Sequence, residues 1–526
     1  MKRFPLAHRF LVVALFTSWA GASSLAESEA APVQQPNIIV ILADDLGYGD
    51  LNLGIPGTDV FKNPHIRTPN LAKLASDGLV MTHHYAASSV CSPSRAGLLT
   101  GRTPNRHNIP KWINDHSDDE RIFLPGSETT IPEILQENGY ETAIIGKWHL
   151  NGADWAQKEN WTGWTGSFPN QQGFDYAFVT KENPHETTAM KHNAQFEPGD
   201  FYRCDGDTVG EPVGKLPGYS SQIIVDQALD WLRQKRDPQK PYFLYLPFDA
   251  VHEKVENPAA FNALYDTGNS DKDKYYANVT YLDAQIGRLL DFLYATKQEK
   301  NTLIVFSSDN GPEVCKVYYN AVHSYGTSYP LHGHKRQIFE GGIRVPGIVR
   351  WSGTIEPGVT DLPNSTLDLL PTLLQAAGIE TPSDLKLDGT SILPHLKHRE
   401  SITREKPLYW QNSIAENWSV IEGSGYDRRF DGRAKNKIPT PIVAIRRGDF
   451  VLRGFRPLGE KSPFVKPEIF QLYDVVNDIN EATELSQFET ERYNEMKTEL
   501  LAMWEAVERD RQKTAQAIDA QVDQRL

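Results

Sequence analysis

The sequence predicts an α/β fold with a large, mostly parallel central sheet flanked by helices, followed by a smaller α+β subdomain with antiparallel strands. Continuous apolar runs alternate with helical patterns up to about residue 385, and this alternation is typical of parallel sheets. Beyond that residue the apolar runs become shorter and are joined by turns. We therefore expect one domain over residues 33–385 and a second over residues 386–526.

The expected strands of the large sheet are apolar runs at residues 37–43, 142–145, 242–246 and 302–306. Apolar side chains recur at helical spacing over 224–231 and 275–289, which predicts helices between these strands. In the second domain, strands at 442–445 and 450–452 flank a turn at Gly448-Asp449. A final amphipathic helix carries one apolar stripe, formed by Tyr493, Met496, Leu500, Trp504 and Val507.

The beginning of the chain predicts a secretory signal peptide over residues 1–26. Lys2 and Arg3 precede an apolar run at 10–20, and the small residues Ala22 and Ala26 follow it, where a signal peptidase would cut. The apolar run is too short to span a bilayer as a helix. We expect the mature protein to be secreted or periplasmic, with no membrane contact once the signal is removed.

The composition excludes several classes of protein. Hydrophobic residues make up 39% of the chain and aromatic residues 10%, which is typical of a folded globular protein. The formal net charge of -14 disfavours nonspecific binding to polyanions, so we expect no nucleic-acid partner. Only Cys91, Cys204 and Cys315 are present, too few for a disulfide-built scaffold. Cys204 and Cys315 remain a candidate pair in an oxidising compartment.

Polar residues follow two of the predicted strands directly. Asp44-Asp45 comes after the strand at 37–43, and Asp309-Asn310 follows the strand at 302–306. Ligands of open α/β sheets bind outside the carboxyl ends of the strands, and oxygen ligands of this kind suit Ca²⁺ or Mg²⁺ better than zinc. An acidic pair at a strand end is also a common helix cap or turn, but the second pair at a matching position favours a metal site.

Cys91 lies at the start of the segment 91–102, which reads CSPSRAGLLTGR. Pro93 suits an early helical position, so we expect Cys91 just before a helix N-terminus, where free backbone N–H groups favour an anion. An isolated cysteine is more often a small buried thiol. The surrounding pattern favours a functional role instead.

The segment 91–102 resembles the signature of the formylglycine-dependent sulfatases, most of all the arylsulfatases and N-acetylgalactosamine-6-sulfatase. Further segments match that family in order, at 43–50, 146–150, 308–311 and 333–346. The resemblance implies an alkaline-phosphatase-like fold and hydrolysis of a sulfated sugar or oligosaccharide. It also implies that a formylglycine-generating or maturase enzyme oxidises Cys91 to formylglycine (3-oxoalanine), whose hydrate attacks sulfur and later releases sulfate.

The same resemblance implies a role for each site residue. One Ca²⁺, with Mg²⁺ as the alternative, would be bound by Asp44, Asp45, Cys91 as formylglycine, Asp309 and Asn310. Arg95 and Lys147 would hold the hydrate, and His149 would assist its deprotonation. His252 would contact sulfate or protonate the leaving oxygen, and Lys335 would bind another sulfate oxygen.

Departures from the family pattern concentrate where the substrate would be selected. His323, His332 and His334 stand where many relatives have glycine-rich sequence or an arginine, and they are expected either in the sugar pocket or on an exposed loop. Glu253 follows His252 where proline is common, and residues 182–185 occupy a region that shapes the pocket. Because the chain is acidic, we expect a pocket for short or terminal units.

Two other functions share these residues. A phosphomonoester, phosphodiester or phosphonate hydrolase of the same superfamily is one, because phosphate and sulfate are both tetrahedral. Such relatives usually have serine or threonine as nucleophile, or bind two metals, and only one set of metal ligands is evident here. A non-catalytic sugar-binding relative is the other, and it would need a damaged site, whereas every key residue is present.

Overall fold

The computed structural model describes residues 35–113, 121–151, 168–180, 195–196, 201–205, 208–253, 255–314, 322–412, 440–457, 460 and 464–523. Residues 35–526 form one compact unit. The predicted signal peptide, Cys315 and residues 182–185 lie outside the described residues. None of the helices in the described ranges combines the length and apolar character needed to cross a membrane.

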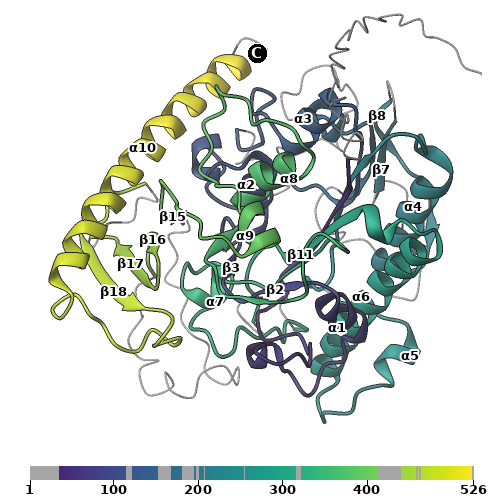
Figure 1. Cartoon of the computed structure of the whole chain (residues 1–526), viewed down its shortest axis with the longest axis horizontal. Coiled ribbons are helices and arrows are strands. Elements are labelled where there is room, and N and C mark those ends of the chain that lie inside the picture. Colours follow the sequence, from purple (N-terminus) through teal and green to yellow (C-terminus); the bar gives the residue numbers. More distant parts are fainter. Residues whose placement is uncertain are drawn as a thin grey trace, which may run out of the picture. The chain divides into compact units, whose positions relative to one another are not determined.

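Within the described residues, a ten-stranded sheet occupies the centre (Figure 1). Its spatial order is β13 (Gly358–Thr360), β2 (Leu79–Met81), β12 (Gly347–Arg350), β11 (Thr302–Ser308), β1 (Asn37–Ala43), β10 (Tyr242–Pro247), β4 (Glu141–Lys147), β5 (Tyr176–Thr180), β7 (Phe201–Asp205) and β8 (Thr208–Pro212). The central strands from β11 to β5 are parallel, whereas β12 and β7 pair antiparallel with both of their neighbours. β13 pairs in parallel with β2. The predicted mostly parallel sheet is thus confirmed, with antiparallel strands toward its edges.

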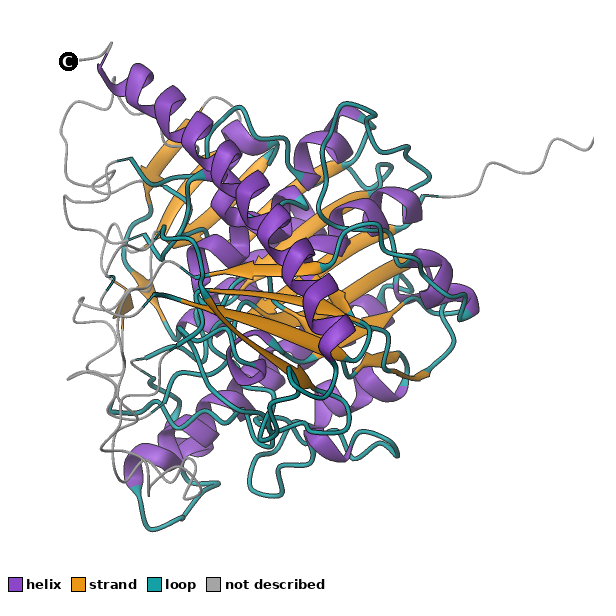
Figure 2. Cartoon of the chain, turned by 90° about the vertical axis from the view of Figure 1, so that its left-hand side faces the viewer, coloured by secondary structure: helices purple, strands orange, loops and turns teal. Residues whose placement is uncertain are grey.

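Helices cover both faces of this sheet (Figure 2). Ile39 and Ile41 of β1 pack into one core, and Ile38 and Val40 pack into the other, so the strand is apolar on both faces. The first core includes α1 (Pro69–Ser76), α4 (Ser220–Asp230) and α6 (Ser270–Ala295), and the second includes α2 (Cys91–Thr100), α3 (Ile131–Glu137), α8 (Leu369–Ala376) and α9 (Leu393–His398). The helices predicted over 224–231 and 275–289 correspond to α4, with the π-helical turn Trp231–Lys235 that follows it, and to α6.

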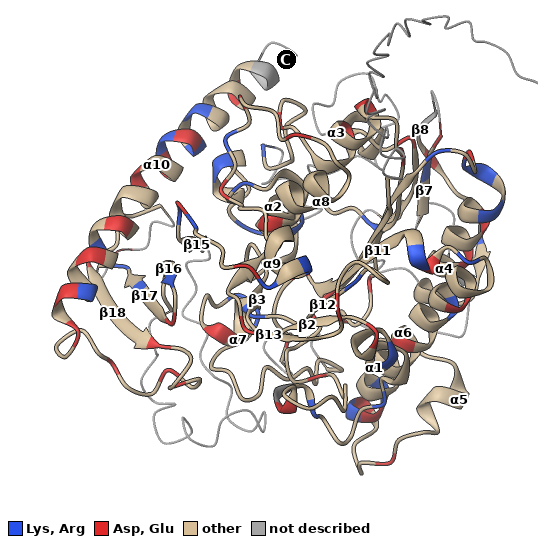
Figure 3. Cartoon of the chain, viewed as in Figure 1, with Lys and Arg blue, Asp and Glu red and all other residues tan. Residues whose placement is uncertain are grey.

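A second, four-stranded sheet follows in the last part of the chain. It contains β15 (Leu408–Gln411), β16 (Val443–Arg447), β17 (Phe450–Phe455) and β18 (Ile469–Asp474), all antiparallel. The helix α10 (Thr490–Asp523) packs Met496, Leu500 and Val507 against this sheet. Acidic and basic residues are interspersed along α10, as expected of a largely solvated helix (Figure 3). The predicted antiparallel subdomain is confirmed, and the boundary at residue 385 stays a prediction.

Shorter elements connect these layers. They are β3 (His84–Tyr85) paired with β14 (Asn364–Ser365), β6 (Gln195–Phe196) paired with β9 (Leu216–Pro217), α5 (Ala259–Asn262) and α7 (Glu340–Ile343). The 3₁₀ turn η2 (Pro104–His107) follows α2.

The strand register places four chain segments at one edge of the large sheet. Ala43, the last residue of β1, pairs with Ser308, the last residue of β11. On its other side β1 pairs with β10, and β10 pairs with β4. The residues that follow β1, β11, β10 and β4 therefore emerge side by side, and they include the two polar pairs predicted from strand ends, Asp44-Asp45 and Asp309-Asn310.

Candidate active site

The two polar pairs predicted from the strand ends lie together. Asp44, Asp45, Asp309 and Asn310 are all buried. The backbone N–H of Asp45 donates to Oδ1 of Asp309 at 3.2 Å, and Nδ2 of Asn310 donates to Oδ1 of Asp45 at 2.7 Å. Asp45 has a left-handed backbone (φ 61°), which turns the chain sharply after β1. The parallel register of β1 and β11 therefore brings three carboxylates and one amide into a single cluster.

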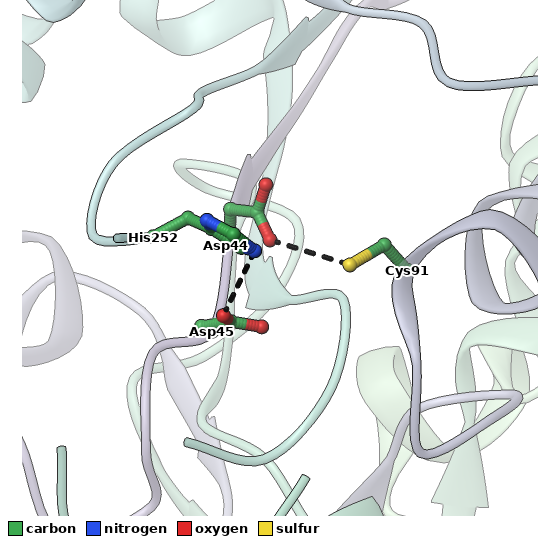
Figure 4. Close-up of side chains that lie close together, drawn as sticks. All are labelled: Asp44, Asp45, Cys91 and His252. Atoms are coloured by element: carbon green, nitrogen blue, oxygen red, sulfur yellow. Dashed lines mark hydrogen bonds and ion pairs between the residues drawn. The ribbon is translucent and has the colours of Figure 1, made fainter. Parts of the chain in front are cut away.

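Cys91 faces this cluster from the start of α2. Cys91 is the first residue of α2, and Val90 is the N-cap residue. The helix therefore begins one residue earlier than expected, because Cys91 was predicted just before its N-terminus. Its Sγ lies 3.7 Å from Oδ1 of Asp44 (Figure 4). Burial raises the pKa of the Cys91 thiol well above its ordinary value, although Lys147 and Lys335 oppose that shift.

Three buried cations surround the carboxylates. Lys147, the last residue of β4, donates from Nζ to Oδ2 of Asp44 at 2.5 Å. Arg95, from the second turn of α2, donates to Oδ2 of Asp309 from Nε at 3.1 Å and from Nη2 at 2.7 Å. Lys335 donates from Nζ to Oδ2 of Asp45 at 2.7 Å. Each carboxylate thus has a cation at hydrogen-bond distance, and Arg95 also lies 3.5 Å from Oδ2 of Asp44.

The pKa values of the carboxylates differ because their surroundings differ. Burial disfavours the charge of Asp44, but Lys147, His252 and Arg95 together outweigh burial and hold its pKa below the ordinary value. Burial raises the pKa of Asp45 to about 7, with Lys335 opposing the shift and Asp44 adding to it. Asp44 therefore stays ionised near neutral pH, whereas Asp45 takes up a proton more readily.

The two predicted histidines approach the cluster in different ways. Nε2 of His252 lies 3.5 Å from Oδ2 of Asp45 (Figure 4). Nδ1 of the same ring lies 2.7 Å from the carbonyl oxygen of Glu253. His149 directly follows the segment of Lys147, and its Nε2 lies 2.9 Å from the carbonyl oxygen of Ile113. Burial, reinforced by Lys147, lowers the pKa of His149 well below its ordinary value, so its ring is neutral.

These residues fit one hard divalent cation. One ligand atom from each of Asp44, Asp45, Cys91 and His252 lies within 4.8 Å of the others. Oδ1 of Asn310 is buried and has no hydrogen-bond partner among the described residues, as a metal ligand would before binding. Carboxylate and amide oxygens are the ligands that Ca²⁺ and Mg²⁺ prefer. Of the predicted ligands, Asp44, Asp45 and Cys91 belong to this group, together with His252, which was predicted as a proton donor. The predicted ligands Asp309 and Asn310 adjoin the group through hydrogen bonds to Asp45.

The three histidines at 323, 332 and 334 are engaged within the protein. Nδ1 of His334 lies 2.9 Å from the carbonyl oxygen of Lys335, and the ring of His332 stacks on Phe339 with centroids 4.2 Å apart. Nδ1 of His323 lies 3.0 Å from Oε1 of Glu253. Their side chains pack against neighbouring residues, and the histidine at 323 is held beside the segment of His252.

Several site contacts belong to no recognisable motif in the sequence. Oε2 of Glu313, a buried acid, is paired with Nη1 of Arg336 at 2.5 Å, next to Lys335. The carbonyl of Ile113, which faces His149, belongs to a segment without a recognisable motif. Glu313 follows the Asp309-Asn310 pair by only a few residues, which is the one hint that it would lie near the site.

Comparison with known proteins agrees with this geometry. The sequence model of the family described as Sulfatase matches residues 36–379. N-acetylgalactosamine-6-sulfatase of Rattus norvegicus is 33% identical over 414 residues, which cover 74% of this chain and 71% of that protein. Arylsulfatase A of Bos taurus is 34% identical over 391 residues, which cover 72% of this chain and 71% of that protein.

A solved structure extends the likeness to most of the chain. The crystal structure titled Ps i-CgsB in complex with k-i-k-neocarrahexaose has a TM-score of 0.68 at 26% identity and covers 90% of this chain and 93% of that one. The predicted alkaline-phosphatase-like fold is thereby confirmed. With a family match over more than half of its length, this chain belongs to the sulfatase family of sulfuric ester hydrolases.

Proposed function

We propose that this chain removes sulfate from a sulfated sugar or oligosaccharide, using a formylglycine made from Cys91 and one bound Ca²⁺. The observation that carries the proposal is the position of Cys91, buried at the N-terminus of α2 with Sγ 3.7 Å from Asp44 and inside a set of paired cations. The carbohydrate class is supported by relatives named for N-acetylgalactosamine 6-sulfate and by a structural neighbour in complex with a neocarrahexaose.

Asp44, Asp45, Asp309 and Asn310, together with residue 91, would hold the cation. When bound, the metal ion supplies positive charge that offsets the negative charge developing on the sulfate group. Ca²⁺ fits better than Mg²⁺ because a site made of protein oxygens replaces most of the hydration shell, which Mg²⁺ gives up reluctantly. The unpartnered Oδ1 of Asn310 supports an ion at this place.

The modified residue 91 supplies a hydroxyl nucleophile that a thiol does not. The first N–H groups of α2 and the cations Lys147 and Arg95 favour negative charge at this point. The carbonyl oxygen of Ile113 can only accept a hydrogen bond, so the neutral ring of His149 carries its proton on Nε2. Nδ1 of that ring therefore keeps its lone pair. The lowered pKa makes this ring a weak base, so we assign His149 a transient role in taking the proton of residue 91.

Two residues at the other side of the cluster suit the substrate. Lys335 carries a buried positive charge and would bind a sulfate oxygen. His252 directs Nε2 toward the cluster and, when protonated, would give that proton to the leaving oxygen. A hydrogen bond to Asp45 fixes the position of the Lys335 ammonium group, and a hydrogen bond to the carbonyl of Glu253 fixes the His252 ring.

The substrate proposed is a short or terminal unit. The chain carries a formal charge of -14, and every cation at the site is already paired with a carboxylate. Basic and acidic residues are interspersed along the ribbon of the described parts of the chain in the view of Figure 3. A long polyanion would therefore find little attraction beyond the pocket. Rapid internal desulfation of a long polymer, without preference for ends, would overturn this part of the proposal.

The route of maturation completes the proposal. Residues 1–26 would direct the chain to the periplasm or out of the cell, and a formylglycine-generating or maturase enzyme would oxidise Cys91. The segment that precedes the described residues supports export by its order of basic, apolar and small residues.

The experiment compares rates on 4-nitrophenyl sulfate and 4-nitrophenyl phosphate, before and after chelation and after Ca²⁺ is restored. We expect the sulfate ester to be preferred, and both activity and melting temperature to fall on chelation and recover with Ca²⁺. Preference for the phosphate ester would favour the phosphate or phosphonate hydrolase. N-acetylgalactosamine 6-sulfate is the first sugar to test because relatives carry that name.

A further inference from the structure

Glu253 is a buried carboxylate that the mechanism above does not use. It directly follows His252 and is 3% exposed. Oε1 lies 3.0 Å from Nδ1 of His323, and Oε2 accepts the backbone N–H of His323 at 2.8 Å and the hydroxyl of Ser324 at 3.0 Å. One side chain therefore joins the segment of His252 to residues some 70 positions further along the chain.

The segment that receives Glu253 is itself anchored. Oδ1 of Asp50, another buried carboxylate, accepts the N–H of Thr327 at 2.9 Å. Oδ2 of Asp50 accepts the N–H of Gly47 at 2.8 Å and the hydroxyl of Tyr275 at 2.7 Å. Residues 323–327 are thus held between Asp50 and Glu253, and they form a fixed support beside the metal-site segment.

The opposite side of the His252 segment is tied to Asp44. The N–H of Asp44 donates to the carbonyl of Ala250 at 2.9 Å, and the N–H of Val251 donates to the carbonyl of Asp44 at 2.8 Å. The short segment that carries His252 is therefore fixed at one end to the metal-site strand and at the other end by Glu253.

The orientation of the His252 ring depends on the same residue. Nδ1 lies 2.7 Å from the backbone carbonyl oxygen of Glu253. Because a carbonyl oxygen can only accept a hydrogen bond, the neutral ring carries its proton on Nδ1. Nε2 then faces Asp45. A displacement of Glu253 would move this carbonyl and turn the ring away from the site. Groups that fix a functional histidine through its second nitrogen commonly control its activity.

We propose that Glu253 is a positioning residue that aims Nε2 of His252 at the leaving oxygen of the substrate. This inference rests on the proposed function. As the bond between sulfur and the leaving oxygen breaks, that oxygen keeps the electron pair and takes the Nε2 proton of the protonated ring, which becomes neutral. A sugar alcohol is a poor leaving group and needs this proton, whereas 4-nitrophenolate leaves readily without it.

The experiment compares kcat of Glu253→Ala on N-acetylgalactosamine 6-sulfate and on 4-nitrophenyl sulfate. We expect kcat on the sugar sulfate to fall by about 10–100-fold, and kcat on the aryl sulfate to change by less than about threefold. His252→Ala should show the same selectivity more strongly. Glu253→Gln should restore most of the rate, because its amide oxygen can accept from residues 323 and 324 and its NH₂ can donate to Nδ1 of His323.

Two further variants separate positioning from loss of stability. Asp283→Ala removes a different buried carboxylate, which accepts the N–H groups of Asn70 and Leu71 away from the site, and it should lower stability without leaving-group selectivity. If Glu253→Ala does not fold, His323→Ala removes one of its three contacts and should show a smaller selective loss.

The outcomes distinguish this inference from the proposed function. Equal losses on both sulfates for a folded Glu253→Ala or His323→Ala variant would overturn the positioning role alone. A wild-type enzyme that is inactive on both sulfate esters, with residue 91 verified as modified, would overturn the proposed function and the inference together.

Discussion

Lys147 shows how the site keeps buried charges together at the scale of one residue. Its ammonium group is fully buried and pairs with Asp44, whose charge it stabilises in return. A buried charge without a partner is strongly unfavourable, so each cation of the cluster requires its carboxylate. In the proposed mechanism the same cations would favour negative charge on a bound sulfate group.

Replacing Lys147 by methionine should lower kcat/KM on 4-nitrophenyl sulfate by about 10²–10³-fold, because one preorganised charge at the reacting group is lost. The matched control is Lys235→Met, whose ammonium group pairs with Asp230 at 3.1 Å on the surface and should leave kcat/KM unchanged. A Lys147→Met enzyme with the rate of the wild type would remove Lys147 from the mechanism.

Part of the site could be predicted from single residues and motifs. Asp44-Asp45, Asp309-Asn310 and the segment 91–102 are local sequence patterns, and the structure brings them together. The support of His252 by Glu253 and His323 was not predictable, because it joins residues that are distant in sequence and depends on how two loops meet. The ion pair of Glu313 with Arg336 was missed for the same reason.

At the scale of elements, Gly146 lets β4 approach β10 just before Lys147. Its φ is 129°, and a Cβ there would lie 1.8 Å from the carbonyl oxygen of Pro247. Only glycine adopts this conformation at such a close approach without strain.

Gly146→Ala should therefore separate the two strands, displace Lys147 and lower the free energy of unfolding by about 3 kcal/mol or more. Gly139→Ala is the control, because Gly139 also has a positive φ of 87° but has open space where a Cβ would lie. Urea unfolding and kcat/KM measure the two effects. If both variants lose the same stability and keep activity, the close approach of β4 and β10 does not position Lys147.

The end of α2 is joined to the next segment by a buried acid. Glu128 accepts from Nη1 of Arg102, just after α2, and Nδ1 of His107 in η2 lies 3.0 Å from its Oε2. Burial opposes the charge of Glu128, but His107 and Arg102 outweigh burial and lower its pKa from 4.5 to about 2.

This shift predicts a defined pH dependence. A carboxylate with a lowered pKa in the folded state stabilises the protein above pH 4.5, and the stabilisation is lost as the pH falls toward about 2. Glu128→Gln should therefore lower the free energy of unfolding at pH 7 by about 3 kcal/mol, measured by urea unfolding. The difference in free energy from the wild type should shrink below pH 4.5. A difference that is the same at pH 3 and pH 7 would contradict the pairing.

The regular elements were the most predictable part of the fold. The strand at 37–43 and the turn at Gly448-Asp449 lie where apolar patterning and turn residues placed them, because both signals are local. The antiparallel strands β7 and β8 near one edge of the sheet were not predicted, because they pair outside the buried centre and lack its continuous apolar runs.

At the scale of the whole molecule, buried charges join the small sheet to the site-bearing part. Arg453 of β17 is fully buried, pairs with Glu481, lies 3.5 Å from Glu340, and donates to the carbonyl of Ile338. Ile338 follows Lys335 closely in the chain, so the small sheet supports the segment that carries a site cation.

Arg453→Ala should leave Glu340 and Glu481 buried without their cation and lower the free energy of unfolding by about 3–5 kcal/mol. Arg447→Ala removes a partly exposed ion pair with Glu499 and should change the free energy of unfolding by at most about 1 kcal/mol. Thermal unfolding with activity assays measures both. Equal stability of the two variants would show that the small sheet does not depend on this buried charge.

The measurement that tests the central claim most directly is the mass of the peptide containing Cys91, taken from active enzyme. Formylglycine makes that peptide about 18 Da lighter than the cysteine form, and we predict this mass with activity proportional to its fraction. A fully active enzyme in which residue 91 is unmodified cysteine would contradict the proposed mechanism.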